Sequence, residues 1–430
     1  MEAIVKLSLV WMLVASLVDA APTDSDQENR QYSLVRAFPD TRSQVDFLHK
    51  QRYQKKAGIE FWKPADWPGR HTDIWVSNAT QKPFTDLLKK QNIFYKVRVN
   101  NWNVSDEEVI MENIDHFDRK YQSFEEITSE LKRLAKGYSE KVNLFEIGKS
   151  YYNKSIYGIQ ILKQSAKKKP LIFFMCGIHG REWLAIASCM YVVRMMIFND
   201  EYENDLQIIT NHFEVVFVPV LNPDGYIHTG SKGGRFWRKT RSKTRDKSCP
   251  GVDLNRNFSF RWGGGGASID ICDETYCGPR PFSERESRAI ASYLYKRRND
   301  LTVFVDVHTY GQLLSHPWGF TRQSSFHQQR QRNVLGNIAR RIFHATGKHY
   351  NYGQTSSILY ETAGDSTDWV YGFLGVVHSY GVELMPRLTD RRSLAGFRQH
   401  KKNIIPSGRV LFIVLNELAK NSLTELDLTS

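Results

Sequence analysis

The sequence predicts an α/β fold in two parts, a small N-terminal unit and a larger C-terminal one. First, residues 31–100 alternate short apolar strands with two helical segments. Second, the pattern changes near residue 121, after which apolar runs such as 171–175 and 215–220 are typical of strands buried on both faces. Third, residues 183–198 are apolar on nearly all sides, which indicates a buried helix. With 430 residues, the chain is long enough for a full-size core and more than one domain.

The N-terminal unit is expected to be a small α/β open sandwich. Its strands are predicted at residues 32–36, 59–62, 72–76 and 94–99, and its helices at 43–50 and 83–91. The acidic, polar stretch 105–118 is typical of a connecting segment. In the larger unit we expect an amphipathic helix at 124–136, further core strands at 302–307 and 376–384, and a closing helix at 407–418.

The first 20 residues have the pattern of a secretory signal peptide. Lys6 precedes an apolar run at 7–18, and small residues at 18–20 suit cleavage. The run is too short to span a bilayer, and no later run is long and apolar enough for a membrane helix. We therefore expect a secreted, extracellular product with no membrane partner.

Composition and short motifs add three further expectations. Five cysteines in an exported chain suggest two disulfides and one leftover thiol. Sequons at Asn78, Asn103, Asn153 and Asn257 are candidate glycan sites, of which Asn257 is expected to stay bare because it lies in a probable active-site segment. The net charge of +13 raises nucleic acid as a partner, but the densest basic run, 231–247, also fits an active-site loop, so we expect no nucleic-acid binding.

Three residues form a candidate metal site. His179 and Glu182 are three residues apart, so one turn brings both side chains to the same side, and His308 is the third candidate ligand. His179 follows the predicted strand 171–175, His308 ends the strand 302–307, and Glu383 lies near the end of 376–384. Ligands in open α/β sheets bind outside the carboxyl ends of strands, which is consistent with one shared crevice. Two imidazoles and one carboxylate suit a catalytic zinc with an open position.

Five motifs in order make the chain resemble a known family. They are HGREW at 179–183, NPDGY at 222–226, RFWRKTR at 235–241, DLNRN at 253–257 and DVHTY at 306–310. Together they are similar to the signatures of the secreted zinc metallocarboxypeptidases, the pancreatic carboxypeptidase A/B family, from about residue 30 to about residue 418. The resemblance implies a mixed, mainly parallel twisted sheet with helices on both faces, preceded by an open-sandwich prodomain. It also implies a zinc exopeptidase that removes the C-terminal residue of peptides and proteins.

The resemblance assigns roles around one zinc ion per chain. His179, Glu182 and His308 would hold the metal, and Glu383 matches the general base. Arg238 matches the arginine that stabilises the tetrahedral oxyanion.

The substrate-binding residues follow in the same way. Asn255 and Arg256 match the pair that binds the substrate's terminal carboxylate, a task suited to the planar fork of arginine. Arg181 would contact the peptide backbone, and Tyr360 matches a mobile tyrosine that closes over substrate. Thr309 and Tyr310 are also placed among the substrate contacts.

The specificity pocket departs from both A-type and B-type enzymes. The main selectivity position falls on Thr367, where A-type members are apolar and B-type members carry aspartate; Thr355 replaces another apolar residue. Asp365 lies two residues before Thr367 and could reach a Lys or Arg side chain. We expect a preference for aromatic and aliphatic C-terminal residues with tolerance of Lys and Arg. The alternatives are a B-type enzyme specific for basic residues and an inactive peptide-binding relative.

The remaining expectations also rest on the resemblance. Cys176–Cys189 and Cys249–Cys272 look like bridges of B-type members, which leaves Cys277 free or paired with another molecule. Residues 21–119 resemble an activation prosegment and residues 120–430 the catalytic domain, so the secreted form would be a monomeric zymogen. Its partners would be peptides with a free C-terminus and an activating protease, for which Arg119–Lys120 is the dibasic candidate near the junction.

Overall fold

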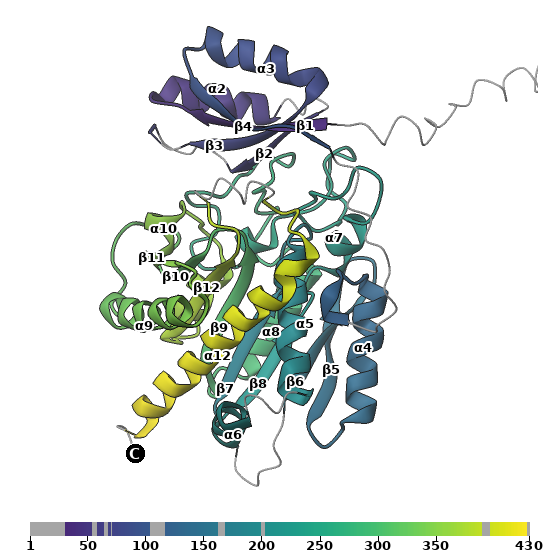
Figure 1. Ribbon diagram of the computed structural model, residues 1–430, viewed down its shortest axis with the longest axis vertical. Coiled ribbons are helices and arrows are strands. Elements are labelled where there is room, and N and C mark those ends of the chain that lie inside the picture. Colours follow the sequence, from purple (N-terminus) through teal and green to yellow (C-terminus); the bar gives the residue numbers. More distant parts are fainter. Residues whose placement is uncertain are drawn as a thin grey trace, which may run out of the picture. The chain divides into compact units, whose positions relative to one another are not determined.

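A computed structural model describes residues 31–53, 58–63, 68–69, 71–103, 117–161, 168–198, 203–388 and 396–427 (Figure 1). The chain divides into two compact units, residues 1–113 and 114–430, which are described separately. The predicted leader 1–20 and most of the predicted connecting segment lie outside the described residues.

The N-terminal unit is a four-stranded antiparallel sheet in the order β2-β3-β1-β4. Its strands are β1 (Gln31–Phe38), β2 (Ile59–Lys63), β3 (Thr72–Ser77) and β4 (Phe94–Asn103). Helices α2 (Arg42–Tyr53) and α3 (Asn78–Lys90) lie on one face of the sheet (Figure 1). Their apolar side chains, including Leu48, Phe84 and Leu88, pack against strand residues such as Val35 and Ile74. Helix α3 begins five residues before the predicted start, with Pro83 inside it.

The C-terminal unit is built on an eight-stranded mixed sheet in the order β11-β10-β12-β9-β7-β8-β6-β5. Its strands are β5 (Val142–Lys149), β6 (Ser155–Ile161), β7 (Leu171–Cys176), β8 (Glu214–Val218), β9 (Leu301–Thr309), β10 (Leu313–His316), β11 (Asn351–Gln354) and β12 (His378–Leu384). The central strands β12, β9, β7 and β8 run parallel, whereas β5, β6 and β8 pair antiparallel, as do β10 and β12. The expected mixed sheet is therefore confirmed.

Helices cover both faces of this sheet. Successive residues of a strand point to opposite faces, so each central strand contributes side chains to two separate cores. Ile172 and Phe174 of β7 belong to one apolar core, whereas Phe173 and Met175 belong to the other. The first core includes side chains of α4 (Phe124–Gly137), α5 (Trp183–Phe198), α6 (Glu203–His212), α9 (Gln328–Thr346) and α12 (Ile404–Asp427). The second includes α8 (Arg285–Lys296) and α11 (Ser366–Gly372). Short elements complete the unit: η2 (Phe117–Arg119), α7 (Pro223–His228), η3 (Leu254–Arg256), α10 (Thr355–Ile358) and η5 (Lys401–Asn403).

Where a helix begins and ends depends on local chemistry. Helix α4 begins at the predicted residue because Ser123 and Glu126 form a capping box, each side chain bonding the other's backbone N–H. Helix α12 extends nine residues beyond the predicted end. No helix among the described residues has the length and apolarity needed to cross a membrane.

Candidate active site

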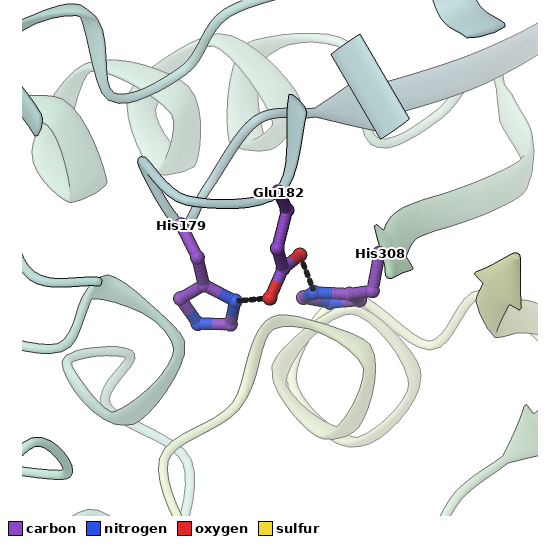
Figure 2. Close-up of side chains that lie close together, drawn as sticks. All are labelled: His179, Glu182 and His308. Carbon is purple, nitrogen blue, oxygen red and sulfur yellow. Dashed lines mark hydrogen bonds and ion pairs between the residues drawn. The ribbon is translucent and has the colours of Figure 1, made fainter. Parts of the chain in front are cut away.

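The three candidate metal ligands converge at the carboxyl ends of β7 and β9 (Figure 2). His179 and Glu182 lie in the turn between β7 and α5, which is closed by a hydrogen bond from the Glu182 N–H to the His179 carbonyl, 3.3 Å. His179 Nδ1 lies 2.7 Å from Glu182 Oε1, and His308 Nδ1 lies 3.0 Å from Glu182 Oε2. The donor atoms lie within 4.8 Å of one another, and all three side chains are buried.

Two aspartates contact the Nε2 atoms of the two imidazole rings. His179 Nε2 lies 3.2 Å from Asp253 Oδ1, and His308 Nε2 lies 3.0 Å from Asp306 Oδ2. Carboxylates in this position fix the tautomer and orientation of metal-binding histidines, leaving Nδ1 of each ring available as a ligand. Sequence reasoning assigned neither aspartate a role. The spacing of Asp306 and His308 could have indicated this contact, because residues two apart on one strand face the same side.

Arg238 lies beside this cluster and is fixed by Asp253. Its Nε and Nη2 donate to Asp253 Oδ2 at 3.0 and 2.8 Å, and its Nη1 lies 3.3 Å from His179 Nδ1. Burial favours the neutral form of Asp253, but Arg238 and His179 outweigh it and hold the pKa of this carboxyl well below its usual range. Burial likewise opposes ionisation of Glu182, yet His179 and His308 lower its pKa below the usual range. Both carboxylates are thus charged at neutral pH.

Glu383 is the nearest residue to His308 across the sheet, because β12 pairs with β9 in the register Glu383–His308. Its Oε2 atom is buried and has no hydrogen-bond partner among the described residues. Burial, together with the negative charges of Glu182 and Asp306, raises the pKa of Glu383 to about 8. A carboxyl group with a pKa this close to neutral can both accept and return a proton, and a metal cation held by the neighbouring ligands would favour its ionised form.

Asn255 and Arg256 lie on the short helix η3, next to the candidate ligands. Asn255 Nδ2 lies 3.2 Å from both Asp306 Oδ2 and His308 Nε2, and Asn255 Oδ1 accepts from the Ser366 N–H at 2.9 Å. Arg256 is 1% exposed and donates to the carbonyls of Gly266 and Asn255 at 2.8 and 2.6 Å. Its Nη2 is buried without a partner among the described residues, so the site presents an unsatisfied guanidinium edge.

The other predicted substrate residues surround the same cluster. The Thr309 N–H donates to Glu182 Oε2 at 3.3 Å, so Thr309 supports a ligand. The Tyr310 ring packs edge-on against Phe397, 5.2 Å between centroids. The Arg256 guanidinium lies 5.9 Å from the Tyr360 ring centroid. Arg181 Nη1 lies 3.2 Å from Glu274 Oε2. Thr309 thus contacts a metal ligand and Tyr360 lies beside the Arg256 side chain, whereas Tyr310 and Arg181 contact Phe397 and Glu274.

Of the three predicted pocket residues, Asp365 and Thr367 form an internally satisfied network, and Thr355 is satisfied separately. Asp365 Oδ1 accepts from the Thr367 hydroxyl at 2.9 Å and the Asp368 N–H at 2.7 Å, and Oδ2 accepts from the Thr362 hydroxyl at 2.5 Å. The Thr355 hydroxyl donates to the His316 carbonyl at 3.0 Å. Burial raises the pKa of Asp365 and raises that of its neighbour Asp368 further, because the two carboxyls also repel. The Asp365 side chain thus caps the N-terminus of α11 and accepts a hydrogen bond from each of two threonine hydroxyls.

Both expected disulfides, Cys176–Cys189 and Cys249–Cys272, are present in the structure. Cys277 is free and fully buried, so its sulfur is not presented for pairing with another molecule. Asn257 is also fully buried, and its amide donates to the Cys277 carbonyl at 2.8 Å and accepts from Ser287 Oγ at 2.7 Å.

The donor set fits zinc. Two neutral imidazole nitrogens and one ionised carboxylate leave a position for water or substrate on a four-coordinate ion. The ion's positive charge would also compensate the buried Glu182 and Asp253. Such a site, with a separate buried carboxylate and an oriented arginine beside it, defines a metal-dependent hydrolase.

Comparison with known proteins gives the family. The chain matches the zinc carboxypeptidase family over residues 127–413 and the carboxypeptidase activation peptide over residues 35–105. It therefore belongs to the zinc carboxypeptidases and is a metallocarboxypeptidase with an activation-peptide region. Zinc is implied by this membership.

Individual relatives cover most of the chain. Human carboxypeptidase A6 is 30% identical over 398 residues, 89% of each chain. Human carboxypeptidase B is 31% identical over 337 residues, 76% of this chain and 79% of the relative. Among solved structures, thrombin-activatable fibrinolysis inhibitor superposes with a TM-score of 0.81 at 27% identity, covering 91% of this chain and 98% of that one. Carboxypeptidase A from Helicoverpa armigera shares the fold, with a TM-score of 0.75 at 24% identity, covering 91% and 97%.

Proposed function

We propose that the protein is a secreted, monomeric zymogen of a carboxypeptidase that removes aromatic and aliphatic C-terminal residues. One zinc ion per chain would be held by His179, Glu182 and His308. Two groups around this cluster carry the proposal. Glu383 Oε2 and Arg256 Nη2 are buried, have no partner in the described part of the chain, and have the chemistry that peptide hydrolysis at a free C-terminus requires.

The proton chemistry falls to Glu383. A zinc ion at these ligands supplies Lewis acidity toward a carbonyl and lowers the pKa of water. Glu383 Oε2 would accept the proton of the attacking water and deliver it to the leaving amine. Arg238 would face the developing oxyanion with Nη1, because its other nitrogens Nε and Nη2 are committed to Asp253.

Selectivity for the chain end would come from Arg256 and Asn255. A substrate carboxylate would satisfy Arg256 Nη2, whereas an internal peptide bond would leave that buried cation unpaired. Arg181 would contact the peptide backbone, and Tyr360 would close over the bound substrate.

The residue preference follows from the satisfied pocket network. The hydroxyl protons of Thr355, Thr362 and Thr367 are all donated to protein oxygens, and both oxygens of Asp365 are occupied. A basic side chain would therefore compete with existing bonds. This favours aromatic and aliphatic residues over Lys and Arg, and it weakens the expectation that Asp365 confers tolerance of basic residues.

The test is turnover of blocked dipeptides that end in Phe, with the C-terminal amide of the same peptide as the matched control. Zymogen processed at an engineered protease site between residues 110 and 111 would be used, with its zinc content measured. We expect hydrolysis of the free acid alone. Zinc-loaded protein that cleaves neither peptide, or both equally, contradicts the proposal.

The structure argues against activation cleavage at Arg119–Lys120. Residues 117–122 belong to the packing of the catalytic unit: Gln122 Nε2 donates to the Phe117 carbonyl at 2.7 Å, Tyr226 Oη donates to the Gln122 carbonyl at 2.5 Å, and Arg194 Nε donates to Asp118 Oδ2 at 3.0 Å. Cleavage at Arg119–Lys120 would require this structure to open. We infer that processing falls N-terminal to Phe117, where residues 104–116 contain no Lys or Arg.

The activating protease would then accept a non-basic residue before the cleaved bond. Limited digestion of the zymogen with trypsin, followed by N-terminal mapping of the products, tests this inference. We expect no product that begins at Lys120 or Tyr121 while the catalytic unit stays folded. Rapid trypsin activation with either N-terminus would restore Arg119–Lys120 as the activation site.

A further inference from the structure

An open groove lies between strand β5 and helix α8 on the surface of the C-terminal unit. Its cavity volume is about 620 Å³, and one of its nine lining residues, Glu146, is acidic. Four other lining residues are basic and exposed: Lys149, Arg285, Arg288 and Lys296. Positive charge therefore predominates along this groove, which we call the basic groove.

Helix α8 arranges its share of the basic groove in a row. Residues three or four apart lie on the same face of a helix, and this spacing holds for Arg285, Arg288, Ser292 and Lys296. At 1.5 Å per residue, the row is about 16 Å long. The opposite face of α8 carries Ile290 and Leu294 into the second core. The row is thus fixed to the folded unit by the packing of the helix.

The charge of this row is not balanced by carboxylates. None of the four cations forms an ion pair within the part of the chain that the structure describes. The acidic residue of α8, Glu286, is fully buried and does not share the exposed face. Like charges three residues apart destabilise a helix, and protein surfaces usually intersperse the two signs. Folding alone therefore does not favour this arrangement.

The two arginines are held in place by neutral groups. Arg285 Nη1 donates to Asn153 Oδ1 at 2.9 Å, and Arg288 Nη1 donates to the carbonyls of Phe282 and Ser283, each at 2.7 Å. These bonds use one terminal nitrogen of each guanidinium and restrict its position. A planar guanidinium edge fixed in this way suits an oxyanion.

We propose that the basic groove binds a sulfated polysaccharide. A row of cations about 16 Å long is matched by a ligand that carries several anionic groups in sequence, whereas a single small anion would contact only part of it. The exposed Ser292 hydroxyl lies in the same row and can exchange hydrogen bonds with sugar hydroxyls.

The aromatic lining argues against a single-stranded nucleic acid as the ligand. Such ligands are bound by aromatic rings on which the bases stack. The aromatic lining residue of the basic groove, Tyr293, already packs against Phe145 at 5.4 Å and Phe173 at 5.7 Å between ring centroids. A sugar chain with anionic substituents does not require such a ring.

The basic groove is separate from the candidate metal ligands. Strand β5 is at the edge of the sheet, three strands from β7, and neighbouring strands are about 4.8 Å apart. About 14 Å therefore separates β5 from the strand that precedes His179. The inference does not depend on the proposed function, because it concerns a different surface.

The test measures binding of a size-fractionated heparin octasaccharide to the full-length protein by isothermal titration calorimetry. A chemically desulfated octasaccharide is the ligand control. In about 50 mM salt we expect binding of the sulfated chain alone. In about 300 mM salt its affinity should fall by about tenfold or more, because exposed charges are screened.

Two double variants locate the binding surface. Lys149→Gln with Lys296→Gln removes two charges of the basic groove and should lower the affinity about tenfold. Lys136→Gln with Lys402→Gln removes the same charge from exposed residues outside the groove, and Lys136 ends α4 as Lys296 ends α8. The control variant should keep its affinity within about twofold. Both double variants should unfold at the temperature of the unaltered protein, because all four side chains are exposed.

Three results would overturn the inference. The first is absence of octasaccharide binding at low salt. The second is an equal loss of affinity in the two double variants, because binding would then reflect overall charge. The third is single-stranded DNA of about 20 nucleotides that binds as tightly as the octasaccharide and shows the same dependence on Lys149 and Lys296, which would make the groove a nucleic-acid site.

Discussion

The residues around the candidate metal ligands and the residues around Asp365 differ in whether their buried polar atoms have hydrogen-bond partners. Around His179, Glu182 and His308, several buried side-chain atoms lack a partner among the described residues, including Glu383 Oε2, Arg256 Nη2 and Asp306 Oδ1. Around Asp365, each carboxylate oxygen and each neighbouring threonine hydroxyl has a partner within the protein. Leaving a buried polar group unpaired costs about 1–3 kcal/mol, so folding alone does not favour the first arrangement.

The difference distinguishes polar groups that would gain a hydrogen-bond or metal partner on ligand binding from polar groups that only stabilise the folded protein. Unpaired atoms gain their partner when metal, water or substrate binds, whereas paired atoms gain nothing. Substitutions at the metal end should therefore change chemistry and leave folding nearly intact. Substitutions in the pocket network should do the reverse. The following four predictions test this contrast in order of decreasing effect.

Removal of a metal ligand should have the largest effect. His308→Ala leaves two of three ligands, so we expect loss of bound zinc and a fall in kcat of about a thousandfold or more, equivalent to several kcal/mol of transition-state stabilisation. Elemental analysis and peptide turnover measure the two effects. Asp306→Asn, which changes only the support of His308, should weaken zinc binding by about 10–100-fold. Full zinc content in His308→Ala would remove this histidine from the ligand set.

Glu383→Gln should separate proton transfer from metal binding. We expect kcat to fall by about 10²–10⁴-fold, the usual contribution of a general base, with zinc content and thermal stability unchanged. Steady-state kinetics and zinc analysis of the same preparation check this. Loss of zinc together with activity would instead mean that Glu383 supports the metal site.

Arg256→Gln should weaken recognition of the chain end. We expect kcat/KM for a peptide with a free C-terminus to fall by about 10²-fold, because a buried charged hydrogen bond is lost. The exposed Arg280 offers a matched control, and Arg280→Gln should have no effect. Equal activity of the Arg256→Gln variant and the unaltered enzyme would show that another group binds the carboxylate.

Asp365→Asn should give the smallest catalytic effect and the clearest effect on stability. The change replaces one carboxylate oxygen by an NH2 group, so the Thr362 hydroxyl loses its acceptor while the remaining oxygen can still cap the helix, and we expect destabilisation of about 1–2 kcal/mol by chemical denaturation. The ratio of rates for Phe and Arg C-termini should change by less than about threefold, because Asp365 already uses both oxygens. A selective loss of more than about tenfold on Arg substrates would make Asp365 a cation receptor and restore the expected tolerance of basic residues.

Sequence reasoning succeeded where periodicity or a motif carried the signal. The buried strand β7, the apolar helix α5 and the capped helix α4 were predictable because burial and capping leave a local pattern. Helices α8 and α9 escaped prediction because both are rich in arginine and polar residues. Their apolar faces can be identified as core-facing only when the second core and the outer strands are known.

The sequence by itself determined the identity of the reactive groups, the family and the division into two folded parts, because these depend on residue types and their order. Only the tertiary structure decided which groups are already paired. Asp253 and Asp306 contact the histidine rings, and Asp365 accepts hydrogen bonds from threonine hydroxyls, whereas Arg256 has one donor without a partner among the described residues. These hydrogen-bond partners come from segments as far apart as residues 179 and 308. Burial and pairing are properties of the folded surroundings, and no spacing along the chain encodes them.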